Sequence, residues 1–298
     1  MKYAVIDVGS NTVRLCIYKI KDGQLSLILN ERVMARLGSK TENGALTDEG
    51  IEAACQALET LRIPLEKTGA DSLHVFATAA LRNITNSQEA VATISQRTGI
   101  DIEVLSGESE AILTFSGAGF DRTLETGILA DVGGGSSEVI IIKNGKPVKT
   151  QSLPIGSLTA FVRFVGKRPA LEEQIANLRQ CVKDMISVSF EKEGSYNVLY
   201  GIGGAARGAY ELEKLLDPSS GGAVSALELL LKRLLQDEKL AETSIQKASP
   251  ERLDTALPGM AILCEIAKFF DCKRMEVCNG GVREGYLLQQ IEKGKMHG

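Results

Sequence analysis

Two short segments of the chain combine an aspartate with a glycine-containing turn, a combination suited to phosphate chemistry. Residues 7–12 read DVGSNT, and residues 131–138 read DVGGGSSE. Glycine and small polar residues expose successive backbone N–H groups that bind phosphate oxygens, and an aspartate can hold a hydrated Mg²⁺. The candidate phosphate-binding residues are Gly9, Ser10, Asn11 and Thr12 in the first segment and Gly133, Gly134, Gly135 and Ser136 in the second.

Both segments belong to a longer repeated pattern. Residues 5–24 (VIDVGSNTVRLCIYKIKDGQ) and residues 129–146 (LADVGGGSSEVIIIKNGK) each contain an apolar strand, Asp-Val-Gly, a small polar turn, a second apolar strand and a DG or NG hairpin turn. One copy alone also fits an ordinary hairpin turn. Two copies in register predict two homologous domains that face each other, each opening with the same phosphate-binding β-hairpin.

Three other segments place polar residues or glycines where a predicted strand ends. GIGGAARG at residues 201–208 puts Gly203 and Gly204 in a turn before a helix, where a ligand can approach the backbone. ATAALRN puts Arg82 just after a strand, and SGESEA puts Glu110 in the first turn of a helix. Carboxylates also stabilise a helix N-terminus, so each of the last two segments taken alone fits a structural role as well.

The composition excludes several other chemistries. The net charge is −4, and two histidines are too few for a histidine-rich metal site. No G-x-x-x-x-G-K-[ST] P-loop occurs, and Cys278 is followed by Arg283 after four residues, where a cysteine-phosphatase loop has five. The chain begins with a strand-like YAVIDVG and has no apolar run of membrane-spanning length, so we expect a cytoplasmic protein.

Strand-like and helix-like segments alternate along the chain, which predicts an α/β fold. Thr47 is an expected N-cap before acidic residues, and DPSSGG at residues 217–222 is an expected loop. The second repeat places the domain boundary so that residues 1–122 form an N-terminal domain and residues 123–298 a C-terminal domain. The principal expected helices are 47–67, 87–98, 107–119, 157–165, 170–190, 204–215, 223–246, 259–270 and 282–292, and the expected strands include 72–79, 101–105, 127–132, 138–143, 197–202 and 274–278.

The motifs together resemble those of the exopolyphosphatase / guanosine pentaphosphate phosphohydrolase family. DVGSNTVRL is similar to its D-x-G-S-N-S opening, ATAALRN to T-x-A-L-R-x-A, and VLSGESEAILTFSGA to I-S-G-x-E-E-A-R-L-x-Y-x-G. DVGGGSSEV is similar to D-I-G-G-G-S-T-E, GIGGAAR to G-x-G-G-T-A-R, and CNGGVREGYL to S-x-G-G-L-R-E-G. The resemblance covers essentially the whole chain. Ser109 departs from it, since the family often has glutamate there.

The resemblance implies the short two-domain branch of a family within the actin and sugar kinase superfamily. Its fold would be two actin-like (ribonuclease H-like) domains with an interdomain cleft. Its activity would be Mg²⁺-dependent release of terminal orthophosphate from inorganic polyphosphate by direct attack of water. Arg82 would grip the terminal phosphate and Glu110 would activate the water. Residues Asp7, Asp131 and Glu138 would hold Mg²⁺ directly or through water.

The sequence leaves other functions open. The substrate could instead be guanosine pentaphosphate (pppGpp), or the protein could bind an alarmone or polyphosphate without hydrolysis. A kinase of the same superfamily, with Gly203 and Gly204 holding an adenosine, is a further alternative. The expected partners are polyphosphate or a guanosine polyphosphate, with a homodimer as the assembly, and neither a membrane nor duplex nucleic acid.

Overall fold

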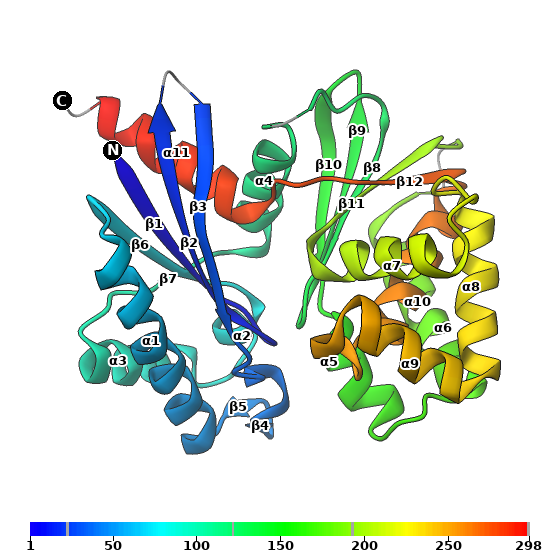
Figure 1. The fold of residues 1–298 in the computed structure, drawn as a ribbon, viewed down its shortest axis with the longest axis horizontal. Helices are drawn as coiled ribbons and strands as arrows, with labels where there is room; N and C mark the ends of the chain where they lie inside the picture. The colour runs from blue at the N-terminus through cyan, green and yellow to red at the C-terminus, as the bar shows by residue number, and fades with distance from the viewer. Residues whose placement is uncertain (22–23, 121, 192–193, 297–298) are drawn as a thin grey trace. The chain divides into compact units, whose positions relative to one another are not determined.

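A computed structural model describes residues 1–21, 24–120, 122–191 and 194–296 (Figure 1). Within these residues the chain forms two five-stranded sheets with flanking helices and one short hairpin of β4 (Thr41–Glu42) and β5 (Ala45–Leu46). This confirms the predicted α/β class. Among the described residues, every helix is too short or too polar to cross a lipid bilayer.

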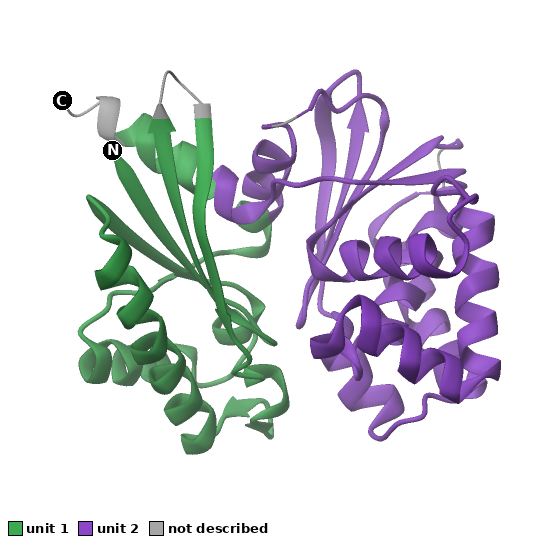
Figure 2. Cartoon of the chain, viewed as in Figure 1, with its two compact units in different colours: residues 1–110, 286–298 green, residues 111–285 purple. Residues whose placement is uncertain are grey.

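The contacts divide the chain into two compact units (Figure 2). Unit 1 contains Met1–Glu110 and Tyr286–Gly298, and unit 2 contains Ala111–Gly285. Two helices, α4 (Gly107–Ala118) and α11 (Val282–Met296), therefore contribute residues to both units. The boundary expected from the repeat, between residues 122 and 123, concerns the duplicated domains and stays a prediction.

The sheet of unit 1 has the order β3-β2-β1-β6-β7. The first three strands are antiparallel neighbours, whereas β6 is parallel to β1 and β7 is parallel to β6. Alternate residues such as Ile6 and Leu15 pack with Leu58 and Ile94 in a buried core. The bounds are β1 (Lys2–Val8), β2 (Val13–Lys21), β3 (Gln24–Val33), β6 (Ser72–Ala77), β7 (Glu103–Val104), η1 (Leu37–Ser39), α1 (Asp48–Thr68), α2 (Ala79–Arg82) and α3 (Ser87–Thr98).

The sheet of unit 2 repeats this topology with the order β10-β9-β8-β11-β12. Again the first three strands are antiparallel neighbours, and the last two are parallel to β8. The strand bounds are β8 (Gly127–Val132), β9 (Ser137–Lys143), β10 (Lys146–Leu153), β11 (Val198–Ile202) and β12 (Arg274–Val277). The duplicated pattern in the sequence thus corresponds to a duplicated sheet, as the repeat predicts.

The hairpin turns of the repeat follow from glycine and asparagine. Asn144 and Gly145 have φ angles of 53° and 72°, which an Asn-Gly turn between twisted strands requires. The corresponding DG turn of the first repeat, at residues 22–23, lies outside the described residues.

One predicted helix of unit 2 is wrong in detail. Residues 223–246 were expected as one helix but form α8 (Val224–Gln236) and α9 (Glu238–Ala248). Asp237 separates them because its carboxylate accepts a hydrogen bond from the Leu240 N–H (2.9 Å) and caps α9. The other helices of unit 2 are α5 (Ser157–Ala160) with the π-helical η2 (Phe161–Val165), α6 (Glu172–Ser189), α7 (Gly203–Leu216), η3 (Pro250–Arg252) and α10 (Ala256–Phe269).

Helix α11 is attached to the sheet of unit 1 through Tyr286. Its ring lies 4.7 Å from the ring of Phe76, and its hydroxyl donates to Glu103 Oε2 (2.5 Å). Burial and the neighbouring Glu103 carboxylate raise the pKa of Tyr286. Since Val75 and Ala77 belong to the core under α1 and α3, Phe76 faces the opposite side of the sheet, and α11 covers that side.

Candidate active site at the carboxyl ends of the parallel strands

In unit 1, three predicted site segments follow one row of paired strand residues. Val8 pairs with Ala77, and Ala77 pairs with Val104. The loops that follow Val8, Ala77 and Val104 lead to the Gly9–Thr12 turn, Arg82 and Glu110, respectively. Parallel strands end at the same side of a sheet, so the fold gathers these residues at one end of the unit 1 sheet.

Arg82 and Glu110 form an ion pair at this end of the sheet. The Arg82 guanidinium also donates through Nη1 to the Leu105 carbonyl oxygen (3.2 Å) and through Nε to Asn83 (3.2 Å). Glu110 is buried in the first turn of α4, where its N–H donates to the Ser106 carbonyl (2.9 Å). The Arg82 guanidinium and the Glu110 carboxylate are therefore held beside each other at one place.

The turn of unit 1 is closed by a backbone hydrogen bond from the Gly9 N–H to the Thr12 carbonyl (3.1 Å). A Cβ at Gly9 would lie 3.0 Å from that same carbonyl oxygen, a tight contact that favours glycine at this position. Asp7 pairs across the hairpin with Arg14. Ser10 is buried, and Asn11 and Thr12 are half-buried.

The turn of unit 2 is closed in the same way, by the Gly133 N–H donating to the Ser136 carbonyl (3.0 Å). Gly133 and Gly134 are half-buried, whereas Gly135 and Ser136 are buried. Asp131 lies one residue before the end of β8 and pairs with Ile202 of β11, directly before Gly203. The duplicated hairpin thus has the same closing hydrogen bond in both units.

Two predicted glycines of unit 2 lie against charged side chains. Gly203 has a φ of 77°, and a Cβ there would lie 2.4 Å from Asp131 Oδ1. Gly204 lies against the Arg252 guanidinium, since a Cβ there would meet Nη2. Gly203 therefore excludes a side chain because its backbone is left-handed, whereas a side chain at Gly204 would have to displace the flexible end of Arg252. Sequence reasoning missed Arg252, whose SPER segment carries no glycine or strand-end pattern.

The two hairpins differ in the residue opposite their aspartate. Asp7 faces Arg14, whereas Asp131 faces Glu138 on β9. Side chains directly opposite each other on antiparallel strands lie on the same face, where two carboxylates repel unless a cation or proton intervenes. Glu138 is 1% exposed, and its Oε1 accepts from the Ser152 hydroxyl (2.8 Å).

This donor set fits a hard cation such as Mg²⁺ at Asp131 and Glu138, because both side chains offer carboxylate oxygens. Three or more metal-binding side chains do not cluster anywhere in the described ranges, so waters or substrate oxygens would complete the coordination. Asp7 belongs to unit 1, and its part in binding the metal stays a prediction. Arg14 was not singled out from the sequence, although a four-residue hairpin turn places it opposite Asp7.

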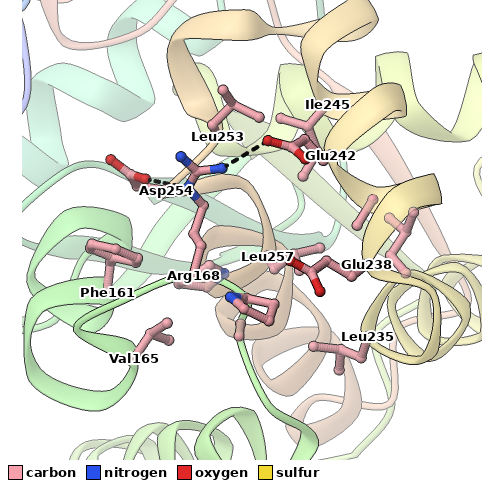
Figure 3. A pocket seen from close by; sticks show the side chains of 15 residues that line it. Phe161, Val165, Arg168, Leu235, Glu238, Glu242, Ile245, Leu253, Asp254 and Leu257 are labelled. Carbon is pink, nitrogen blue, oxygen red and sulfur yellow. Dashed lines mark hydrogen bonds and ion pairs between the residues drawn. The ribbon is translucent and has the colours of Figure 1, made fainter.

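A separate cavity of about 50 Å³ lies among the helices of unit 2 (Figure 3). Arg168 pairs at its rim with Asp254 (2.9 Å) and Glu242 (3.3 Å), and apolar side chains such as Val165 and Leu257 line it. Ligand pockets usually measure at least about 300 Å³. This cavity contains none of the predicted site residues, and its size indicates a packing gap.

Comparison with known proteins gives consistent matches over nearly the whole chain. A model of the Ppx/GppA phosphatase family matches residues 16–294. A Haemophilus influenzae protein named as an exopolyphosphatase is 26% identical over 296 residues, which cover 97% of this chain and 91% of that protein.

Solved structures show the same fold. A crystal structure of an Aquifex aeolicus Ppx/GppA family member is 25% identical, with a TM-score of 0.78, and the match covers 99% of this chain and 98% of the other. The crystal structure of an exopolyphosphatase from Cytophaga hutchinsonii has a TM-score of 0.84 at 22% identity and covers 98% of both chains. With the family model matched from β2 to α11, this chain belongs to the Ppx/GppA phosphatase family.

Proposed function

We propose that this protein is an exopolyphosphatase that releases terminal orthophosphate from inorganic polyphosphate in a Mg²⁺-dependent reaction. The observation that carries the proposal is the Arg82–Glu110 ion pair, held where β6 and β7 end and one strand away from the Gly9–Thr12 turn. A phosphate-binding guanidinium beside a carboxylate is the minimum required to hold a terminal phosphate next to a base for water. Family membership and the name of the Haemophilus influenzae relative support the same activity.

In the proposed reaction, the water oxygen bonds to the terminal phosphorus while the bond from phosphorus to the bridging oxygen breaks. Glu110 accepts a proton from the water, and the shortened chain leaves with the electron pair on the bridging oxygen. Arg82 holds the oxygens of the terminal phosphate through its planar fork. The buried position of Glu110 keeps its carboxylate oriented toward the arginine and therefore toward the bound phosphate.

The rest of the site binds the polyanion. The backbone N–H groups of the Gly9–Thr12 and Gly133–Ser136 turns, apart from the first N–H of each turn, which closes it, would contact phosphate oxygens. Gly203 and Gly204 would allow the polyphosphate chain to approach the start of α7. Asp131 and Glu138 would hold Mg²⁺, which when bound neutralises phosphate charge. Without positive charge between them, these carboxylates would repel the substrate.

The substrate is tested by measuring orthophosphate released from long polyphosphate, tripolyphosphate and pppGpp, each with and without Mg²⁺. We expect release from long polyphosphate, with Mg²⁺ and without ADP. Faster release from pppGpp than from both polyphosphates would make the protein a guanosine pentaphosphate phosphohydrolase. Binding without release from any substrate would identify a binding protein, and a requirement for ADP would identify a kinase.

Substituting either turn glycine is expected to remove most of the turnover. In Gly9→Val and Gly134→Val, a branched side chain restricts the backbone of a turn that offers its N–H groups to phosphate. Because the two turns have the same closing hydrogen bond, we expect each variant to lose at least about 10²-fold in kcat/KM on the same substrate.

The matched control is Gly119→Val. Gly119 is exposed, and a Cβ there would meet its nearest atoms at 3.6 Å and 3.7 Å, which is ordinary contact. This control should keep wild-type kinetics. If Gly9→Val or Gly134→Val stays fully active, that turn does not bind the substrate.

A further inference from the structure

Two carbonyl oxygens of the Gly133–Ser136 turn accept hydrogen bonds from the segment that follows β10. The Gly133 oxygen accepts from the N–H of Ser157 (2.8 Å) and from its hydroxyl (3.0 Å). The Gly134 oxygen accepts from the N–H groups of Leu158 (2.9 Å) and Thr159 (3.0 Å). In the described part of the chain, these two oxygens accept four hydrogen bonds, all from the first residues of α5.

This arrangement determines where the turn directs its own donors. In a planar trans peptide, the C=O of one residue and the N–H of the next point in opposite directions. Because the oxygens of Gly133 and Gly134 point toward α5, the N–H groups of Gly134 and Gly135 point away from it. Two successive N–H groups that point the same way form an anion-binding concavity.

The turn of unit 1 has the same kind of support. The Ser10 oxygen accepts from the Gly38 N–H (2.8 Å), and the Asn11 oxygen accepts from the Arg36 N–H (3.0 Å). The supporting segment again follows the third strand of the sheet, here β3. Arg36 has a φ of 51°, a left-handed conformation that is costly for a residue with a side chain. The strain at Arg36 is consistent with a backbone that must aim its N–H at the turn.

Gly156 allows α5 to approach the turn of unit 2. A Cβ at Gly156 would lie 2.5 Å from the Gly134 carbonyl carbon and 2.6 Å from the Gly135 nitrogen. Atoms cannot approach this closely, so any other residue here displaces either the turn or α5. The Gly156 N–H itself donates to the Thr159 hydroxyl (2.9 Å), which fixes the start of the helix.

We propose that Gly156 and Ser157 are positioning residues, which orient the N–H groups of Gly134 and Gly135 for a phosphate oxygen of the substrate. They act through the turn, and neither contacts the phosphate. The inference rests on the proposed function for the identity of the substrate, and on the hydrogen bonds alone for the orientation of the turn. In unit 1, Arg36 and Gly38 hold the N–H groups of Asn11 and Thr12 in the same way.

The test compares two buried serines of unit 2. Ser157→Ala removes one donor to the turn oxygen of Gly133. The matched control is Ser137→Ala, because the Ser137 hydroxyl is also buried and donates to a backbone carbonyl, that of Ile155 (2.6 Å), which is outside the turn. Each variant loses one hydroxyl hydrogen bond, so similar losses of thermal stability are expected.

Binding of tripolyphosphate, measured by isothermal titration calorimetry, should separate the two variants. We expect Ser157→Ala to raise the Kd about three- to tenfold and Ser137→Ala to change it less than about twofold. Gly156→Ala should lower kcat by about 10²-fold, because it displaces the turn itself. If Gly156→Ala does not fold, Ser157→Ala still decides, since it removes a single oxygen atom.

Equal effects of Ser157→Ala and Ser137→Ala on the Kd would overturn the inference, as would a wild-type Kd in Ser157→Ala. The proposed function fails separately, when the wild-type protein releases no orthophosphate from polyphosphate. In that case the calorimetric comparison still tests the orientation of the turn, because it measures binding without turnover.

Discussion

Glu110→Gln is expected to lower kcat on polyphosphate by about 10²–10⁴-fold while the protein stays folded. Glutamine has nearly the same shape as glutamate but cannot accept a proton from the attacking water. Glu110 is buried and paired with Arg82, so bulk water cannot easily take its place as the proton acceptor. The KM should change little, because Arg82 and the two turns, which we propose bind the phosphates, remain in place.

The matched control for this experiment is Glu108→Gln. Glu108 lies in the same first turn of α4, so its substitution changes the charge of the helix N-terminus by the same amount. Unlike Glu110, it is exposed. We expect Glu108→Gln to stay within about threefold of the wild-type protein. Steady-state kinetics with thermal melts of both variants are the measurement, and a Glu110→Gln variant within threefold of wild type would remove Glu110 from the catalytic role.

Chelation is expected to abolish turnover, and added Mg²⁺ to restore it. Asp131 and Glu138 face each other across β8 and β9, and a substrate made of phosphates adds further negative charge. Asp131→Asn removes one charged ligand, so the Mg²⁺ concentration for half-maximal turnover should rise by about tenfold or more, with part of the activity recovered at high Mg²⁺.

The control for the metal is Asp254→Asn. Asp254 belongs to the same unit, but its carboxylate pairs with Arg168 at the rim of the small cavity (Figure 3). Its loss should leave the Mg²⁺ dependence of turnover unchanged. Orthophosphate release is measured against Mg²⁺ concentration for both variants. Undiminished wild-type activity in excess chelator would show that Asp131 and Glu138 have another role.

The sequence alone was sufficient to predict the class of fold and to single out candidate site residues, whose roles stay predictions. The alternation of apolar segments follows from burial in strands and helices, and the duplicated Asp-Val-Gly hairpin is visible because the turn residues are local. The Asn144-Gly145 turn and the Thr47 cap follow from the same local chemistry, and the structure confirms both. The break at Asp237 was missed because apolar residues continue on both sides of it, and a single capping side chain decides it.

Tertiary structure alone decided which distant residues meet. Arg82 and Glu110 are 28 residues apart, and they pair because β6 and β7 are parallel neighbours that end at the same side of the sheet. The contact of α5 with the Gly133–Ser136 turn depends on the return path of the chain after β10, which no periodicity encodes. Local sequence therefore determined the Gly133–Ser136 turn itself, whereas packing between distant segments determined which way its N–H groups point.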